Sequence, residues 1–119
     1  LDDVDYLGEK LRPRLEQSLA AKGYKVLFWT DAGWVRFFSK EPILHPDDLR
    51  KMKLFSWAGS QHQADLWKSA GFHPVALETG NIASALTSGT ISAVPTPRVF
   101  ALFSRLTDIG KIKYMLELN

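Results

Sequence analysis

Short apolar runs of strand length alternate with helical patterns from Pro46 to the end of the chain, and this alternation constrains the fold most. The three longer helical patterns are each followed by a glycine, the residue that most often ends a helix. The strand-like runs are residues 53–57, 74–77, 90–94 and 112–118, and the helical patterns are residues 46–49, 60–70, 81–88 and 97–108. This order predicts an α/β domain with a mostly parallel sheet flanked by helices.

The N-terminal segment has its own helical pattern. Apolar residues recur at helical spacing over residues 3–22, and three aspartates stand at the start, where the helix dipole favours acids. Pro13 predicts a kink or a break, and Gly23 predicts the end of the helix. We therefore expect residues 1–23 to form a helix apart from the α/β domain, residues 24–119.

Two further apolar runs, residues 24–30 and 34–39, flank a turn-like sequence at residues 31–33. Both have the length and the content of large apolar residues that are typical of strands. They predict either a hairpin or two long strands that meet at a turn facing the ligand.

Several classes of function find no support in the sequence. There is no cysteine, and His45, His62 and His73 match no zinc motif. The glycines form no phosphate loop, and no serine lies in a Gly-x-Ser-x-Gly elbow. The net charge is only +2 and the basic residues are scattered, which disfavours nucleic-acid binding. We therefore expect no catalytic residue, no metal site and no cofactor.

Four blocks of sequence follow one another in the order and near the spacing of a known family. They are Pro42-Ile43 with Pro46-Asp47-Asp48-Leu49, then Ala70-Gly71-Phe72-His73-Pro74-Val75, then Ala85-Leu86-Thr87-Ser88-Gly89-Thr90-Ile91, and last Ile112-Lys113-Tyr114-Met115. This series resembles the solute-binding proteins of TRAP transporters (the DctP-like family). The resemblance implies a divergent fragment of a two-lobed receptor: mainly the second periplasmic-binding-protein-like lobe, with strands that cross to the first lobe and a helix from the lobe interface.

The resemblance also implies a function. A receptor of this family works in the periplasm, outside the cytoplasm, although this sequence opens without a signal peptide. It closes over a small organic ligand by a hinge motion and delivers the ligand to the membrane permease of the transporter. Two alternatives stay open: a ligand-sensing α/β domain of a regulatory protein, and a small α/β enzyme, for which no convergent acid–base or nucleophilic set is visible.

The sequence departs from the family where the family binds an acid. Phe55 stands where the family usually has an arginine that pairs with the ligand carboxylate, and the Asp and Glu of a later family block are replaced over residues 91–95. Phenylalanine cannot bind both carboxylate oxygens as a guanidinium does. We therefore hypothesise a ligand that is apolar or weakly charged.

The candidate ligand-binding residues follow from the rule that open α/β sheets bind ligands at the carboxyl ends of their strands. They are Trp34, Phe55, Trp57, Asn81 and Thr96, with Arg36 as a displaced cation and Arg98 as a comparable candidate. Backbone N–H groups at Ser60 and Gln61 could also hold an anionic or carbonyl group. The simpler interpretation is that the aromatics fill the core and that Arg36 lies in a salt bridge on the strand surface.

The last helical pattern is apolar over more than half of its circumference, at Val99, Phe100, Leu102, Phe103 and Leu106. Such a helix is either buried or paired. If it is exposed, it predicts self-association of this chain through the helix and the crossing strands.

Overall fold

A computed structural model of the chain describes residues 2–117 and shows two compact units, one up to Asp31 and one from Ala32 onward. The first unit contains α1 (Asp2–Ala20), which is continuous through Pro13, so a break at that residue is wrong. Gly23 has a left-handed φ of 82°, and its N–H donates to Ala20 O at 3.0 Å. The predicted helix and its glycine stop are therefore confirmed.

The predicted strand at residues 24–30 is wrong, and so is the hairpin. These residues form no regular structure, and the side chains of Leu27 and Phe28 are 83% and 75% exposed. The next strand, β1 (Val35–Ser39), pairs on one side with β4 (Ala93–Pro97) and on the other with β5 (Tyr114–Leu116). Both hydrogen-bonding edges of β1 are thus occupied, and no edge is left for a hairpin partner.

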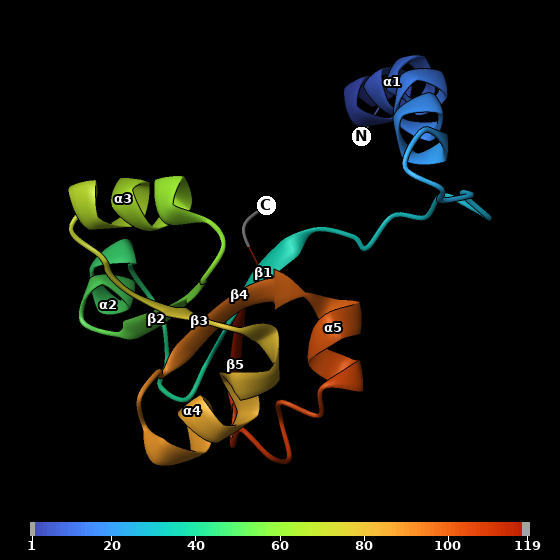
Figure 1. Cartoon of the computed structure of the whole chain (residues 1–119). Helices are drawn as coiled ribbons and strands as arrows, with labels where there is room; N and C mark the ends of the chain where they lie inside the picture. The colour runs from blue at the N-terminus through green and yellow to red at the C-terminus, as the bar shows by residue number, and fades with distance from the viewer. Residues whose placement is uncertain (1, 118–119) are drawn as a thin grey trace. The chain divides into compact units, whose positions relative to one another are not determined.

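The second unit contains a five-stranded sheet in the order β3-β2-β4-β1-β5 (Figure 1). β2 (Lys53–Trp57) runs parallel to β3 (His73–Leu77) and to β4, whereas β1 is antiparallel to both of its neighbours. Four strands therefore point the same way and β1 alone points back. The last strand is shorter than the predicted run of residues 112–118: residues 112, 113 and 117 lie outside the strand, and residue 118 lies outside the described residues.

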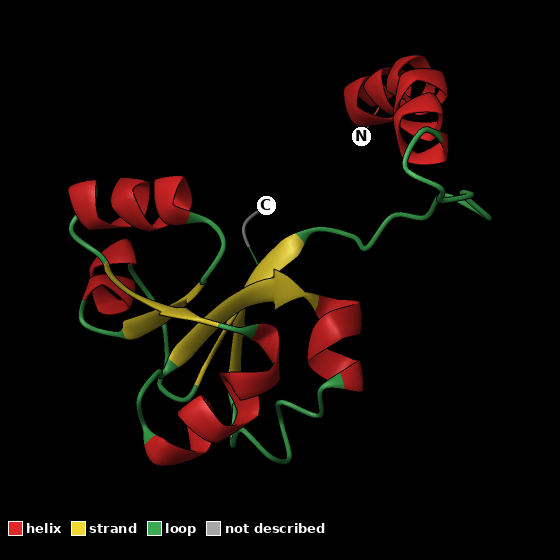
Figure 2. Ribbon diagram, in the orientation of Figure 1, coloured by secondary structure: helices red, strands yellow, loops and turns green. Residues whose placement is uncertain are grey.

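Helices cover both faces of the sheet (Figure 2). α2 (Pro46–Arg50) and α3 (Gln61–Ser69) pack on one face, where Phe37, Leu54 and Ala93 point. On the other face lie the 3₁₀ turn η1 (Thr79–Asn81), α4 (Ile82–Ser88) and α5 (Arg98–Phe103). The predicted α/β lobe, with a sheet flanked by helices, is confirmed.

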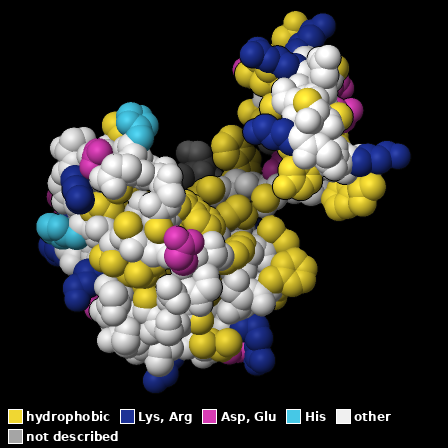
Figure 3. Space-filling view, viewed as in Figure 1, with side chains coloured by type: hydrophobic (Ala, Val, Ile, Leu, Met, Phe, Trp, Pro, Cys, Tyr) yellow, Lys and Arg dark blue, Asp and Glu magenta, His cyan; other side chains and the backbone are white. Residues whose placement is uncertain are grey.

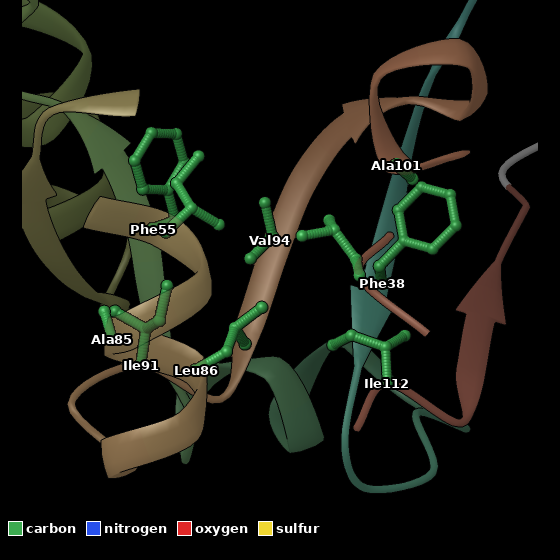
Figure 4. Packing of buried hydrophobic residues seen from close by; sticks show 10 residues of the cluster. Phe38, Phe55, Ala85, Leu86, Ile91, Val94, Ala101 and Ile112 are labelled. Atoms are coloured by element: carbon green, nitrogen blue, oxygen red, sulfur yellow. The ribbon is translucent and has the colours of Figure 1, made fainter. Parts of the chain in front are cut away.

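The core on the α4 and α5 face gathers side chains from three adjacent strands. Phe38, Phe55 and Val94 point from the sheet toward Leu86 and Ala101 of the helices (Figure 4). Neighbouring residues of each strand point to the opposite face, because side chains alternate along a strand.

Two predicted boundaries are wrong for reasons visible in the backbone. β4 starts at Ala93 rather than at residue 90, because Ile91 still belongs to the turn after α4 and its N–H donates to Ala85 O at 3.2 Å. α5 ends at Phe103 rather than at residue 108, because the chain turns at Arg105, whose φ is 49°.

Candidate functional site

The reversed direction of β1 brings the first residues of that strand to the carboxyl ends of the other four. Arg36 lies opposite Thr96 in the β1–β4 register, and Trp57 lies beside Leu77 in the β2–β3 register. Glu117 follows the last residue of β5 and is ion-paired with Arg36. We call these five residues the edge row. Arg36, Trp57 and Thr96 lie on the sheet face that α4 and α5 cover, because Phe38, Phe55 and Val94 of the same strands lie two residues away in the core of that face. Leu77 packs against the same core, and Glu117 joins this face through its ion pair with Arg36.

Two arginines share one carboxylate at the end of the edge row. Arg36 donates from Nε and Nη2 to Glu117 Oε1, at 3.1 and 2.6 Å. Arg98, the first residue of α5, donates from Nη2 to Glu117 Oε2 at 2.9 Å. The side chain of Arg36 is only 14% exposed, against 58% for Arg98. We call Arg36, Arg98 and Glu117 the Arg–Glu cluster.

The cluster carries a net positive charge. The side-chain hydrogen bond from Arg36 lowers the pKa of Glu117 below its ordinary value, and the charges of Arg36 and Arg98 act in the same direction. The carboxylate is therefore ionised at neutral pH. Because two guanidinium groups meet one carboxylate, an excess of one positive charge is left for an anion.

Thr96 adds an unused polar group beside Arg36. Its side chain is 2% exposed, and its Oγ1 has no hydrogen-bond partner within residues 2–117. A buried hydroxyl without a partner costs about 1–3 kcal/mol. The hydroxyl is covered in this structure, so a ligand atom could bond to it only after the side chains around it move.

The aromatic candidates divide into core and surface. Phe55 is 1% exposed and belongs to the core, as the simpler interpretation of the sequence holds. Its ring packs edge-to-face against Trp57, with centroids 5.0 Å apart, so that Phe55 supports the Trp57 ring from the core side. Trp57 itself is 40% exposed, and Trp34, just before β1, is 60% exposed. Among the aromatic candidates, these two tryptophans have exposed surface that a ligand can contact.

The remaining sequence candidates lie near the same edge without a clear polar role. Asn81 closes η1 after β3 and is exposed. The N–H of Ser60 donates to Trp57 O at 3.0 Å, so this backbone group is already used. Figure 3 shows hydrophobic side chains gathered over the strands between α3 and α5 on the face in view.

Sequence reasoning missed Glu117. The sequence places this residue only within the last predicted strand, whereas the fold places it beside Arg36, 81 residues away along the chain. An acid directly after the last strand is a weak signal. It becomes informative only once β5 is known to pair with β1.

The described part of the chain holds no group of three or more His, Asp or Glu side chains placed to bind a metal ion. Within the same residues, no helix has the length and apolar character that crossing a membrane requires.

Solved structures of the same fold are extracytoplasmic receptors. A Bordetella pertussis receptor that binds pyroglutamic acid is 23% identical, with a TM-score of 0.73 over 96% of this chain and 36% of that one. A Ralstonia eutropha H16 receptor with bound (S)-2-acetolactate is 22% identical, with a TM-score of 0.76 over 94% and 36%. A Polaromonas receptor bound to D-erythronate is 25% identical, with a TM-score of 0.69 over 88% and 34%.

The chain thus spans about a third of the length of these receptors. The comparison with curated protein sequences gave no significant match. The family model of the bacterial extracellular solute-binding proteins, family 7 (DctP), matches residues 4–115. That match covers most of the chain and agrees with the order of sequence blocks and with the fold. The chain therefore belongs to the DctP family of extracellular solute-binding proteins, whose members are transport receptors of the TRAP type.

Proposed function

We propose that this chain is the ligand-binding lobe of a periplasmic receptor that binds a small organic acid and delivers it to the membrane permease of a TRAP transporter. The observation that carries the proposal is the position of Arg36. Its guanidinium is largely buried at the carboxyl edge of the sheet, beside the unpartnered hydroxyl of Thr96. A guanidinium is well suited to a carboxylate, because its planar fork can donate to both oxygens.

The ligands of the related receptors support an acid. Pyroglutamic acid, (S)-2-acetolactate and D-erythronate each carry one carboxyl group. In this chain the carboxylate would bond to Arg36, and the rest of the ligand would lie against Trp57 and Trp34. Asn81 stays a candidate contact at the same edge.

The position of Phe55 changes the hypothesis of an apolar ligand. Because the ring is buried in the core, it does not line a pocket in place of the family's arginine. The apolar part of the site is limited to the exposed surface of the tryptophans, and Arg36 supplies a cation. We propose a weakly charged ligand, with one anionic group, rather than an uncharged one.

The alternatives have less support. The family match is to transport receptors, which favours neither a regulatory domain nor an enzyme. That residues 1–23 come from the lobe interface, and that strands cross to another lobe, stays a prediction. Self-association also stays a prediction, although Leu102 and Phe103 of α5 are 75% and 81% exposed.

Titration by NMR tests the proposal, because it detects weak binding and resolves the indole N–H signals of the tryptophans. Pyroglutamate and D-erythronate should shift the indole signals of Trp57 and Trp34. Arg36→Ala should weaken this binding about tenfold or more, since a charged hydrogen-bonded pair contributes about 1.5–3 kcal/mol. Arg50→Ala, at the end of α2 on the other face, is the matched control and should leave binding unchanged. Equal binding by both variants and the original chain would contradict the proposal.

A further inference from the structure

Glu117 already binds the guanidinium of Arg36, which is the group that a ligand carboxylate would use. One of its oxygens accepts two hydrogen bonds from Arg36, and the other accepts one from Arg98. Both guanidinium groups are thus directed at a carboxylate of the chain itself. A ligand that reaches Arg36 must share it with Glu117 or displace Glu117 toward Arg98.

The charges of the cluster set how many anionic groups a ligand can bring. The two arginines and one glutamate sum to +1, which one ligand carboxylate neutralises. A second carboxylate in the same site has no cation left in the cluster and lies near the ionised Glu117, so the two repel one another.

Glu117 also sets what the ligand must offer beside its carboxylate. An ionised carboxylate accepts hydrogen bonds and donates none. A neighbouring ligand group therefore fits only if it donates, as a hydroxyl or an amide N–H does. Glu117 is 41% exposed in its side chain, so a bound ligand can reach it.

We infer that Glu117 determines specificity, by selecting monocarboxylates with a hydroxyl or N–H donor near the carboxylate and rejecting dicarboxylates. The inference rests on the proposed function, because it concerns the ligand of the same site. Arg98 has a definite part in it. Without Arg98, Arg36 and Glu117 would neutralise each other and leave no charge for an anion.

Pairs of ligands that differ only at their far end test the inference. D-Erythronate and meso-tartrate differ by oxidation of one terminal CH₂OH to a carboxylate, and L-gulonate and D-glucarate differ in the same way. The chain should bind the monocarboxylate of each pair at least about tenfold more tightly in NMR titrations, since tenfold corresponds to about 1.4 kcal/mol and like charges placed side by side cost at least that much.

Glu117→Gln removes the negative charge and keeps the size of the side chain. By freeing positive charge it should strengthen the binding of both kinds of anion, and that of dicarboxylates about tenfold more than that of monocarboxylates. Glu41→Gln makes the same change in charge two residues beyond the far end of β1 and should leave the preference as it is. Far-UV circular dichroism and thermal unfolding show whether the variants are folded.

The outcomes separate the inference from the proposed function. If the original chain binds neither member of any pair, the proposed function is wrong and the inference falls with it. If it binds both members equally, or if Glu117→Gln leaves the preference unchanged, the inference is wrong and the proposed function stands. If Glu117→Gln does not fold, Arg98→Gln decides: it should weaken monocarboxylate binding about tenfold, and unchanged binding would overturn the inference.

Discussion

Replacing Phe55 with alanine tests whether this residue belongs to the core or to the ligand site. The ring is 1% exposed and lies in a cluster to which β1, β2, β4, α4 and α5 all contribute. Truncation of a buried phenylalanine to alanine costs about 3–5 kcal/mol, because the transfer free energy of the ring is lost and a cavity remains. The edge-to-face contact with Trp57 accounts for about 0.5–1.5 kcal/mol of this.

A loss of this size is a large share of the stability of a small domain, which is about 5–15 kcal/mol in total. We expect the midpoint of urea unfolding, followed by far-UV circular dichroism, to fall by roughly 1–5 M, because the slope m is about 1–3 kcal/mol per M for small proteins. Phe103→Ala is the matched control: the same change at a side chain that is 81% exposed should alter the free energy of unfolding by no more than about 0.5 kcal/mol. Equal shifts for the two variants would refute the assignment of Phe55 to the core.

Two further substitutions test local features of the fold. Gly110→Ala should lower the melting temperature, because a Cβ at this buried glycine would lie 2.6 Å from Leu86 Cδ1; an unchanged melting temperature would show that the turn after α5 adapts freely. Asp48→Asn should destabilise the chain at neutral pH and much less in acid. The backbone N–H groups of His45 and Leu44 lower the pKa of Asp48, so its contribution is present above the ordinary carboxyl pKa and is lost as the pH falls through the lowered value. A difference in melting temperature that does not depend on pH would contradict this explanation.

The elements from Pro46 onward could be predicted because their signals are local. A proline at the first helical position, glycines after the helices, and apolar runs of five residues all act within a few positions of the chain. α2, α3 and β2 therefore appear where the pattern places them. The start of β4 at Ala93 shows the limit of such local signals. Ile91 is apolar because it packs in the core next to α4, although it does not belong to a strand.

The apolar run at residues 24–30 could not be interpreted correctly from its composition. A strand needs a partner edge, and composition says nothing about which edges are free. In this chain β1 uses both of its edges for β4 and β5, which come some 60 to 80 residues later in the sequence. Trp29 instead donates its indole N–H to Glu16 Oε1 at 2.6 Å, within the first unit.

The candidate site could be predicted as a place but not as a set of charges. The rule about strand ends brings Trp57 and Thr96 to one edge, and the reversed β1 adds Arg36 to them. From the sequence alone, Phe55 indicates that the site lacks the family's cation, and it favours a ligand that is apolar or weakly charged. In the fold, Phe55 lies in the core. The choice of ligand then depends on how much positive charge of the two arginines Glu117 leaves unneutralised. That balance depends on the pairing of β1 with β5, and so a change at residue 117 should alter ligand choice more than a change at residue 55.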